Sequence, residues 1–309
     1  MAVREARGRE DYDACVSLQR EVWGLSDLEI TSAIQLIATV HAGGLLLVAE
    51  AASGPIVGFS YGFAAWSDGA AHVHSDMLAV LPAWRGRGVG LRLKWAQRKA
   101  VLDRGLGLVT WTFDPMRVKN ARLNLSHLGA ISHEFLPDLY GRTSSALHHG
   151  LATDRLLARW ELRSPRVRRL AAGQAAPARA TQAERLNHVR LQGGLPVSSE
   201  PRLDLDARRL LLEVPPDWDA VCRADPGLAR EWQGVVRRSL EAVFARGYAA
   251  VAVAAVPGAP GIAYVLERLV IRSRLRQAAA GRKTTRSRTP RKASRAGRRG
   301  AARAGRGRW

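Results

Sequence analysis

A glycine-rich turn is the part of the sequence whose residue types best fit a chemical role. It consists of Arg85, Gly86, Arg87, Gly88, Val89 and Gly90, and it follows a strand-like run that ends at Val80-Leu-Pro82. Glycines at a helix N-terminus leave backbone N–H groups free to converge on an anion, and two arginines and the helix dipole add positive charge. We expect the turn to bind a pyrophosphate. The alternative is a purely structural turn, because its spacing differs from both common nucleotide-binding loops.

A second group of polar residues lies just before this turn. His72, His74 and Asp76 alternate along a predicted strand, which places all three on one face of a sheet. If that face lines a cleft, His74 or Asp76 is a candidate base that removes a proton. A solvated strand face is the alternative. His72 and His74 are also spaced to ligate a metal, but the pattern supplies no third ligand, so we expect no metal site.

Composition separates a folded body from a basic tail. Of 309 residues 47% are hydrophobic, which excludes a wholly disordered chain. The net charge is +21, but residues 271–309 hold 15 of the 48 basic residues and none of the 27 acidic ones. We expect this tail to be disordered when free. It is either a non-specific contact for polyanions or a solvated extension.

Cysteine count and hydropathy bear on the compartment. Cys15 and Cys222 are the two cysteines, which excludes a disulfide-rich secreted module and favours a reducing cytoplasm. The start of the sequence is charged where a secretion signal needs an apolar core. The longest uncharged stretch, residues 248–266, is broken by prolines and glycines, so we expect two strands there and no membrane span.

Hydrophobic periodicity predicts an α+β fold. Strands are expected at residues 3–5, 45–51, 56–66, 71–80, 106–113, 131–136 and 156–162. Helices are expected near residues 12–23, 31–41, 91–102 and 118–128. This order describes a mostly antiparallel meander that passes into a βαβ unit, with helices flanking the sheet.

We expect the chain to divide into four parts. These are a first domain (residues 1–163), a linker or irregular excursion (residues 164–208), a C-terminal extension (residues 209–270) and the tail (residues 271–309). The extension reads as β-α-β-β, with Trp218 and Trp232 as packing residues. One helix is too little to cover two sheet faces. We therefore expect the extension to pack on the first sheet and to help wall its cleft.

Two segments of the chain resemble the GCN5-related N-acetyltransferase family. The family's cofactor loop reads Arg/Gln-x-x-Gly-x-Gly/Ala after a strand ending Val-x-Pro, which Val80 to Gly90 matches. The stretch from Val118 to Ala130 is similar to the family's late helix, in which an Asn, here Asn120, approaches the cofactor. The resemblance covers about the first half of the chain. The whole chain looks similar to the larger, two-part members of this family.

The resemblance implies acyl transfer from acetyl-CoA, or another acyl-CoA, to an amine that attacks the thioester directly. The pantetheine arm would pair with strand backbone at Leu78 and Val80, beside the loop. The family's acid is a tyrosine four residues before the glycine that closes the late helix, and Leu125 stands there. Tyr140 is the replacement candidate, and Ser126 is a weaker one. Glu134 is an outside candidate for binding a cationic substrate, and His148 and His149 are expected in a surface loop.

Three classes of function remain open on this evidence. The first is an N-acyltransferase whose acceptor is a small-molecule amine. The second is a non-catalytic CoA-binding or regulatory protein on the same fold, which the missing tyrosine favours. The third is a nucleic-acid-associated protein that acts through its tail, and it predicts that deleting residues 271–309 abolishes function. The sequence leaves the acceptor and the oligomeric state open.

Overall fold

The computed structural model describes residues 1–141, 143–145, 148–174, 183–256, 258 and 260–269. The predicted α+β class is confirmed. The strands are β1 (Ala2–Glu5), β2 (Leu45–Glu50), β3 (Ile56–Ser67), β4 (Ala70–Val80), β5 (Leu108–Phe113), β6 (Ile131–Leu136), β7 (Arg155–Glu161), β8 (Glu184–Arg185), β9 (Val189–Gln192), β10 (Leu195–Ser198), β11 (Arg209–Val214), β12 (Tyr248–Ala255) and β13 (Ile262–Arg268). The α-helices are α1 (Gly8–Trp23), α2 (Ala33–His41), α3 (Val89–Asp103), α4 (Val118–Ala121), α5 (Pro165–Ala171), α6 (Trp218–Ala224) and α7 (Pro226–Ala245).

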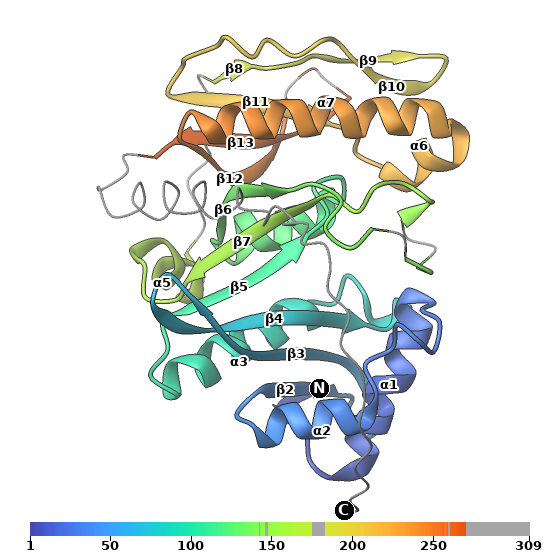
Figure 1. Ribbon diagram of the computed structural model, residues 1–309, viewed down its shortest axis with the longest axis vertical. Helices are drawn as coiled ribbons and strands as arrows, with labels where there is room; N and C mark the ends of the chain where they lie inside the picture. The colour runs from blue at the N-terminus through green and yellow to red at the C-terminus, as the bar shows by residue number, and fades with distance from the viewer. Residues whose placement is uncertain (142, 146–147, 175–182, 257, 259, 270–309) are drawn as a thin grey trace, which may run out of the picture. The chain divides into compact units, whose positions relative to one another are not determined.

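Eleven of these strands form one sheet in the order β1-β2-β3-β4-β5-β7-β6-β12-β13-β11-β8, and β9 and β10 form a separate hairpin. The strand pairs are antiparallel except β4 with β5 and β11 with β8. Figure 1 shows the sheet continuing from the N-terminal strands through β7 and β6 into β12 and β13. The chain therefore adds its C-terminal strands to the sheet that its N-terminal half begins.

Two apolar clusters hold the helices on the N-terminal strands. Tyr12 and Leu18 of α1 and Leu36 of α2 pack with alternate residues of β2, β3 and β4 on one face. Leu93 and Val101 of α3 pack in the larger cluster, which also holds the buried Trp160 of β7. Side chains alternate between the faces of a strand, so β2, β3 and β4 each contribute to both clusters.

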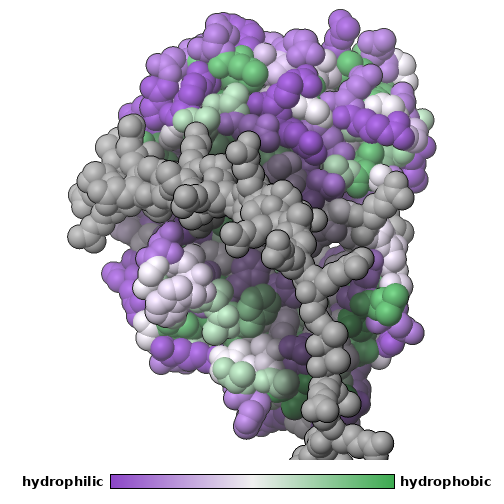
Figure 2. Space-filling model, in the orientation of Figure 1, coloured by the Kyte–Doolittle hydropathy of each residue, from purple (hydrophilic) through white to green (hydrophobic). Residues whose placement is uncertain are grey.

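The larger cluster extends without a break into the C-terminal half. It includes Trp218, Trp232, Tyr248 and Tyr264, of which Trp218 is 5% exposed and Trp232 is 1% exposed. The link between β6 and β12 is short, because only Ser132 and Ala250 pair there. Side-chain packing therefore joins the two halves more than backbone pairing does. Hydrophilic residues dominate the visible surface over α7 and the β9–β10 hairpin, at the top of Figure 2.

Residues 164–208, expected to be irregular, contain α5 and the short strands β8, β9 and β10. Ser164 caps α5 by accepting from the backbone N–H of Val167. The extension holds one more helix than expected, since Asp217 caps α6 before Asp225 caps α7. The basic tail lies outside the described residues. No helix in the described part of the chain is both long and apolar enough to cross a membrane.

Candidate active site

Strands β4 and β5 separate soon after they meet. They pair only at Val73 with Val109 and at His74 with Thr110, after which each strand continues without the other. Beside this point Gly62 of β3 lies opposite two residues of β4, Ser75 and Asp76, where the register shifts. A bulge of this kind inserts an extra residue and bends the strand. The result is a gap between two neighbouring strands in the middle of the sheet.

The bulge also breaks the predicted alternation of polar residues. Ser75 faces α3, since its hydroxyl accepts from Lys94 and Gln97. Met77 faces the opposite cluster with α1 and α2, whereas Leu78 packs in the larger cluster. The strand therefore reverses its parity between Ser75 and Met77, so the alternation predicted from His72 onward does not continue past the bulge.

Asp76 and His74 consequently have different surroundings. Asp76 lines the cleft described below, and His74 does not. The His74 ring lies 5.4 Å from the ring of Phe63, and its Nδ1 lies 3.0 Å from the Thr110 hydroxyl. Burial lowers the pKa of His74 and of His72. Of the two predicted bases, only Asp76 reaches the cleft.

A cleft of about 600 Å³ opens beside the gap. Its lining comes from the α1–α2 connection, β4, α3, the end of β5, the helix after β5 and the segment around β6 and β7: Gln19, Trp23, Leu25, Glu29, Thr31, Ser75, Asp76, Met77, Leu78, Lys94, Trp111, Thr112, Phe113, Asp114, Arg117, Asn120, Asn124, Tyr140, Thr143, Ser145, His148 and Arg155. Polar side chains are therefore concentrated in one concave site.

Two loops meet over this cleft. The Glu29 carboxylate accepts from the backbone N–H of Ser144 at 2.8 Å and from its hydroxyl at 2.7 Å. Ser145 donates its hydroxyl to the carbonyl of Trp23 at 3.0 Å. These bonds connect the α1–α2 loop with the loop between β6 and β7. Residues of both loops line the cleft, so these bonds hold two parts of its wall together.

The predicted anion loop lies at the far end of β4. Gly86 and Gly88 both have φ near +76°, a conformation that favours glycine, and Gly88 is the N-cap of α3 without any side-chain cap. The N–H groups of the first turn of α3 thus receive no capping side chain. Arg85 donates to the Val80 carbonyl at 3.2 Å, and the Arg87 guanidinium stacks 5.2 Å from the Trp84 ring centroid. This loop fits a pyrophosphate, although it does not itself line the cleft.

Lys94 is a cleft residue that the sequence analysis missed. It is 2% exposed, and its Nζ donates to Gln97 Oε1 at 2.7 Å and to Ser75 Oγ at 3.1 Å. The same Nζ lies 3.8 Å from the Trp111 ring centroid. No described carboxylate forms an ion pair with it, and burial lowers its pKa well below the ordinary value. A buried charge on this amine is costly to desolvate, which is the physical cause of the lowered pKa.

Two other predicted site residues reach the cleft. Burial raises the pKa of Asp76, so its carboxylate is a stronger base than that of an ordinary aspartate. The Tyr140 hydroxyl lies 2.8 Å from Thr112 Oγ1 at the end of β5, and the side chain lines the cleft. The loop after β6 thus folds back far enough for Tyr140 to reach the gap between the strands.

The late helix continues from α4 into a π-helical turn, Arg122–His127, and ends at Gly129 with φ 79°. Asn120 lines the cleft. Leu125 is fully buried in the core, so this helix carries no hydroxyl at the position of the family's acid. Ser126 points elsewhere: its hydroxyl donates to the Val253 carbonyl and accepts from the Val253 N–H.

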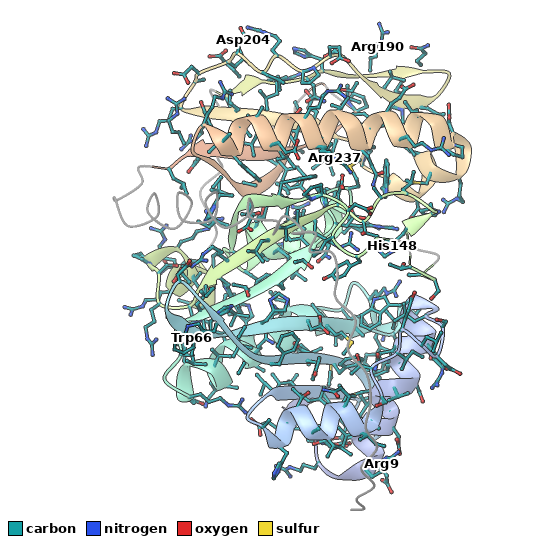
Figure 3. All side chains as sticks on the ribbon, in the orientation of Figure 1. Arg9, Trp66, His148, Arg190, Asp204 and Arg237 are labelled. Atoms are coloured by element: carbon teal, nitrogen blue, oxygen red, sulfur yellow. The ribbon has the colours of Figure 1, made fainter. Side chains whose placement is uncertain are left out.

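The C-terminal half supports this cleft without lining it, because the lining residues lie between positions 19 and 155. The expected contribution to the wall is indirect. Arg117 donates to Asp219 of α6 at 2.5 Å, and Arg237 of α7 pairs with the buried Asp154 at the same distance. Figure 3 shows Arg237 on α7 and His148 between α7 and α1.

His148 is a second cleft residue that the sequence did not single out. It lies in a loop, as expected, and there it lines the cleft and bonds to Thr143 and Arg155. Its neighbour His149 pairs with Asp219 at 2.8 Å. Glu134 lies on β6 and does not line the cleft. No sequence period marked His148, because an irregular loop carries it.

No protein-family model matches the chain, and no curated protein matches it. The similar solved structures include a ribosomal-protein-alanine N-acetyltransferase from Brucella melitensis, which is 18% identical and has a TM-score of 0.43 over 52% of this chain and 98% of its own. A Salmonella typhimurium protein, solved with its cofactor acetyl-CoA, is 19% identical with a TM-score of 0.41 over 58% and 98% of the two chains. A Streptococcus mutans protein is 20% identical with a TM-score of 0.44 over 52% and 99%.

TM-scores below 0.5 are too low to assign an activity, which has to come from this chain's own residues. Those residues do define the fold. The elements from β1 to β7 follow the expected order, β4 and β5 separate at a bulge, and a glycine-rich loop joins β4 to α3. These features agree with the resemblance of the N-terminal part of the chain to the GCN5-related N-acetyltransferases.

Proposed function

We propose that the protein is an N-acyltransferase that moves an acetyl or other acyl group from acyl-CoA to a small-molecule amine. The observation that carries this proposal is the continuity of three features. The N-terminus of α3, which has no capping side chain, lies at one end of β4. The gap between β4 and β5 lies further along the same strand, and the cleft opens beside that gap. This arrangement suits a long donor with an anionic end and a reactive end.

The donor would lie along β4. Its pyrophosphate would occupy the loop from Arg85 to Gly90, where backbone N–H groups and two arginines favour an anion. Its pantetheine arm would follow Leu78 and Val80 into the gap, and Asn120 would face it from the other side. Acyl-CoA supplies the thioester. The protein supplies position, which by itself accounts for much of the rate in reactions of this kind.

Two side chains are assigned proton-transfer roles in the cleft. Asp76 would take a proton from the acceptor ammonium, which leaves a neutral amine to attack the thioester carbonyl. A C–N bond then forms and the C–S bond breaks; the nitrogen releases its second proton to water, and the departing thiolate takes a proton. Tyr140 is the proposed donor of that proton, because Leu125 removes the family's usual acid.

Turnover tests the proposal directly. Acetyl-CoA and longer acyl-CoAs are titrated calorimetrically, and thiol release is then followed over a panel of amines, amino acids and peptides. We expect saturable acyl-CoA binding and thiol release that depends on the amine. Absence of acyl-CoA binding in the folded protein would disprove the assignment.

The buried Leu125 supports a second candidate, a CoA-binding protein that does not catalyse transfer. It predicts tight acyl-CoA binding with no amine-dependent thiol release. A version that lacks residues 271–309 should behave like the full chain in both cases. If deletion abolished function, the activity would belong to the tail and to nucleic acid instead.

The buried, unpaired Cys15 and Cys222 suit the reducing cytoplasm that we propose as the location of the protein.

A further inference from the structure

Arg155 is a buried cation in the cleft without a carboxylate partner. It begins β7, is 8% exposed and lines the cleft. Its guanidinium donates to the carbonyl of Asp154 and to Nε2 of His148, both at 2.9 Å, and it lies 5.2 Å from the Tyr140 ring centroid. Among the described residues no carboxylate lies within ion-pair distance of it, and all its polar partners are neutral groups. A buried charge without a counter-charge is costly unless a ligand supplies one.

The neighbouring arginine shows the contrast. Arg117 also lines the cleft, but it pairs with Asp219 at 2.5 Å and with Asp114 at 3.9 Å. Its charge is therefore balanced within the protein. Burial raises the pKa of Asp114, and the charge of Arg155 opposes that rise without forming an ion pair. Of these two cleft arginines, Arg155 is the one that forms no ion pair with a described carboxylate.

Asp76 is the opposite case in the same cleft. Its carboxylate forms no ion pair and no hydrogen bond with any described residue. The other cleft carboxylates are in use: Glu29 accepts from Ser144, and Asp114 accepts from the backbone N–H of Met116 at 2.7 Å. The cleft thus contains one unmatched carboxylate and one unmatched guanidinium.

The protonation state of His148 determines how many N–H donors of Arg155 remain for a ligand. Its Nε2 accepts from Arg155, so the ring is neutral and its Nδ1–H donates to Thr143 Oγ1 at 2.7 Å. Burial and the nearby Arg155 charge lower the pKa of His148, which keeps the ring neutral. A guanidinium carries more N–H donors than these two bonds use. The remaining donors are available to a planar anion, which Arg binds through paired hydrogen bonds.

We propose that the acceptor is an amino acid or a similar zwitterion, whose amine lies at Asp76 and whose carboxylate is bound by Arg155. This inference rests on the proposed function and names its substrate class. A cleft of about 600 Å³ has room for a small acceptor between these two groups. Asp76 selects and deprotonates the ammonium, while Arg155 orients the molecule from its other end.

Matched pairs of acceptors test the inference in the unmodified protein. Glycine, β-alanine, γ-aminobutyrate and ε-aminocaproate are compared with their primary amides, which keep the amine and the chain length but lose the charge. With acetyl-CoA as donor, kcat/KM by thiol release should favour the best acid over its amide by at least about tenfold. Equal rates for every pair would overturn the inference and leave the acyltransferase proposal intact.

Variants then locate the preference. Arg155→Gln should reduce the ratio of acid to amide to about one, because it removes the charge and retains hydrogen bonding. Arg159→Gln is the matched control on the same strand, since Arg159 pairs with Asp68 and Glu161 and does not line the cleft. It should keep the ratio of the unmodified protein. A ratio unchanged in Arg155→Gln would overturn the assignment to Arg155.

Calorimetry separates this inference from the activity. If no amine releases thiol, the acyltransferase proposal fails, and binding of the four acids and four amides to the protein with CoA decides the subsite. Tighter binding of an acid than of its amide, lost in Arg155→Gln, supports the subsite. Binding of neither, or of both equally, overturns it. Thermal unfolding of each variant confirms that the protein compared is folded.

Discussion

Arg117 in the cleft wall and Asp219 on α6 form an ion pair at 2.5 Å across a hundred and two positions of sequence. The pair joins a residue that lines the cleft to a helix that does not. Gln233 of α7 adds a bond to the carbonyl of Ala152, and Tyr264 of β13 donates to the carbonyl of Pro115. The C-terminal half thus fixes the backbone on both sides of the cleft. We expect cleft geometry to respond to changes in α6 and α7.

Substituting Gly88 with Asp should weaken acetyl-CoA binding by at least about tenfold, because a carboxylate at the N-terminus of α3 repels an anion. Calorimetric titration measures the affinity. Gly105→Asp is the matched control, since Gly105 also has positive φ and open space around it but lies after α3. Equal affinity in both folded variants would remove the pyrophosphate site from this loop.

Asp76→Asn should lower kcat by about a hundredfold, while His74→Gln should leave it near that of the unmodified protein. Asp76 acts as a base only when ionised, and its pKa is raised. The rate of the unmodified protein should therefore fall as pH drops through that raised pKa. Asn at position 76 should abolish this acidic limb. Retention of the limb in Asp76→Asn, or its loss in His74→Gln, would assign the base elsewhere.

Lys94→Met should change how stability depends on pH. The folded protein lowers the pKa of Lys94, so the unfolded chain binds a proton there that the folded protein releases. The free energy of unfolding should rise from the folded-state pKa up to the ordinary lysine pKa, by at most about 1.4 kcal/mol per pH unit for one proton. Lys94→Met should lack this rise.

Urea unfolding near neutral pH and near pH 9.5 measures that difference, at values chosen below the ordinary lysine pKa of about 10.4. Lys99→Met is the control, because Lys99 is exposed and pairs with Asp103 one helical turn later. It should follow the unmodified protein. Parallel pH dependence in all three proteins would mean that Lys94 stays protonated in the fold.

Arg237→Met should lower the free energy of unfolding by about 3 kcal/mol, because it leaves a buried carboxylate unpaired. The side chain of Asp154 is 4% exposed and pairs with Arg237 at 2.5 Å. Arg238→Met removes the next arginine, whose partner Glu200 is 84% exposed, and should cost less than about 0.5 kcal/mol. Similar losses in both variants would contradict a supporting role specific to Arg237.

Hydrophobic periodicity was sufficient to predict the N-terminal elements, since each strand or helix of this half has a clear period and several of them end near a glycine or proline. It failed at the bulge, where one inserted residue reverses the faces of β4. A signal existed: Gly62 lies inside a predicted strand, and a Cβ there would come within 2.8 Å of the His74 carbonyl. Glycine in a strand often marks such a close approach.

Lys94 also left a trace in the sequence. It shares a helix face with Gln97 and Val101, which are spaced as residues that pack against a sheet, so a lysine there is out of place. His148 and Arg155 gave no comparable signal. Their meeting depends on how an irregular loop folds back over the sheet, and no local pattern encodes that. Arg237 and Asp154 meet only because the two halves of the chain share one core.

The width of the sheet has a consequence for self-association. An exposed strand edge can pair with another chain and seed aggregation. Here the strand at one end of the eleven, β1, has four residues and carries Arg4 and Glu5, and the strand at the other end, β8, has two. Among the described residues both end strands are short and charged. These two strands therefore offer other molecules little backbone to extend.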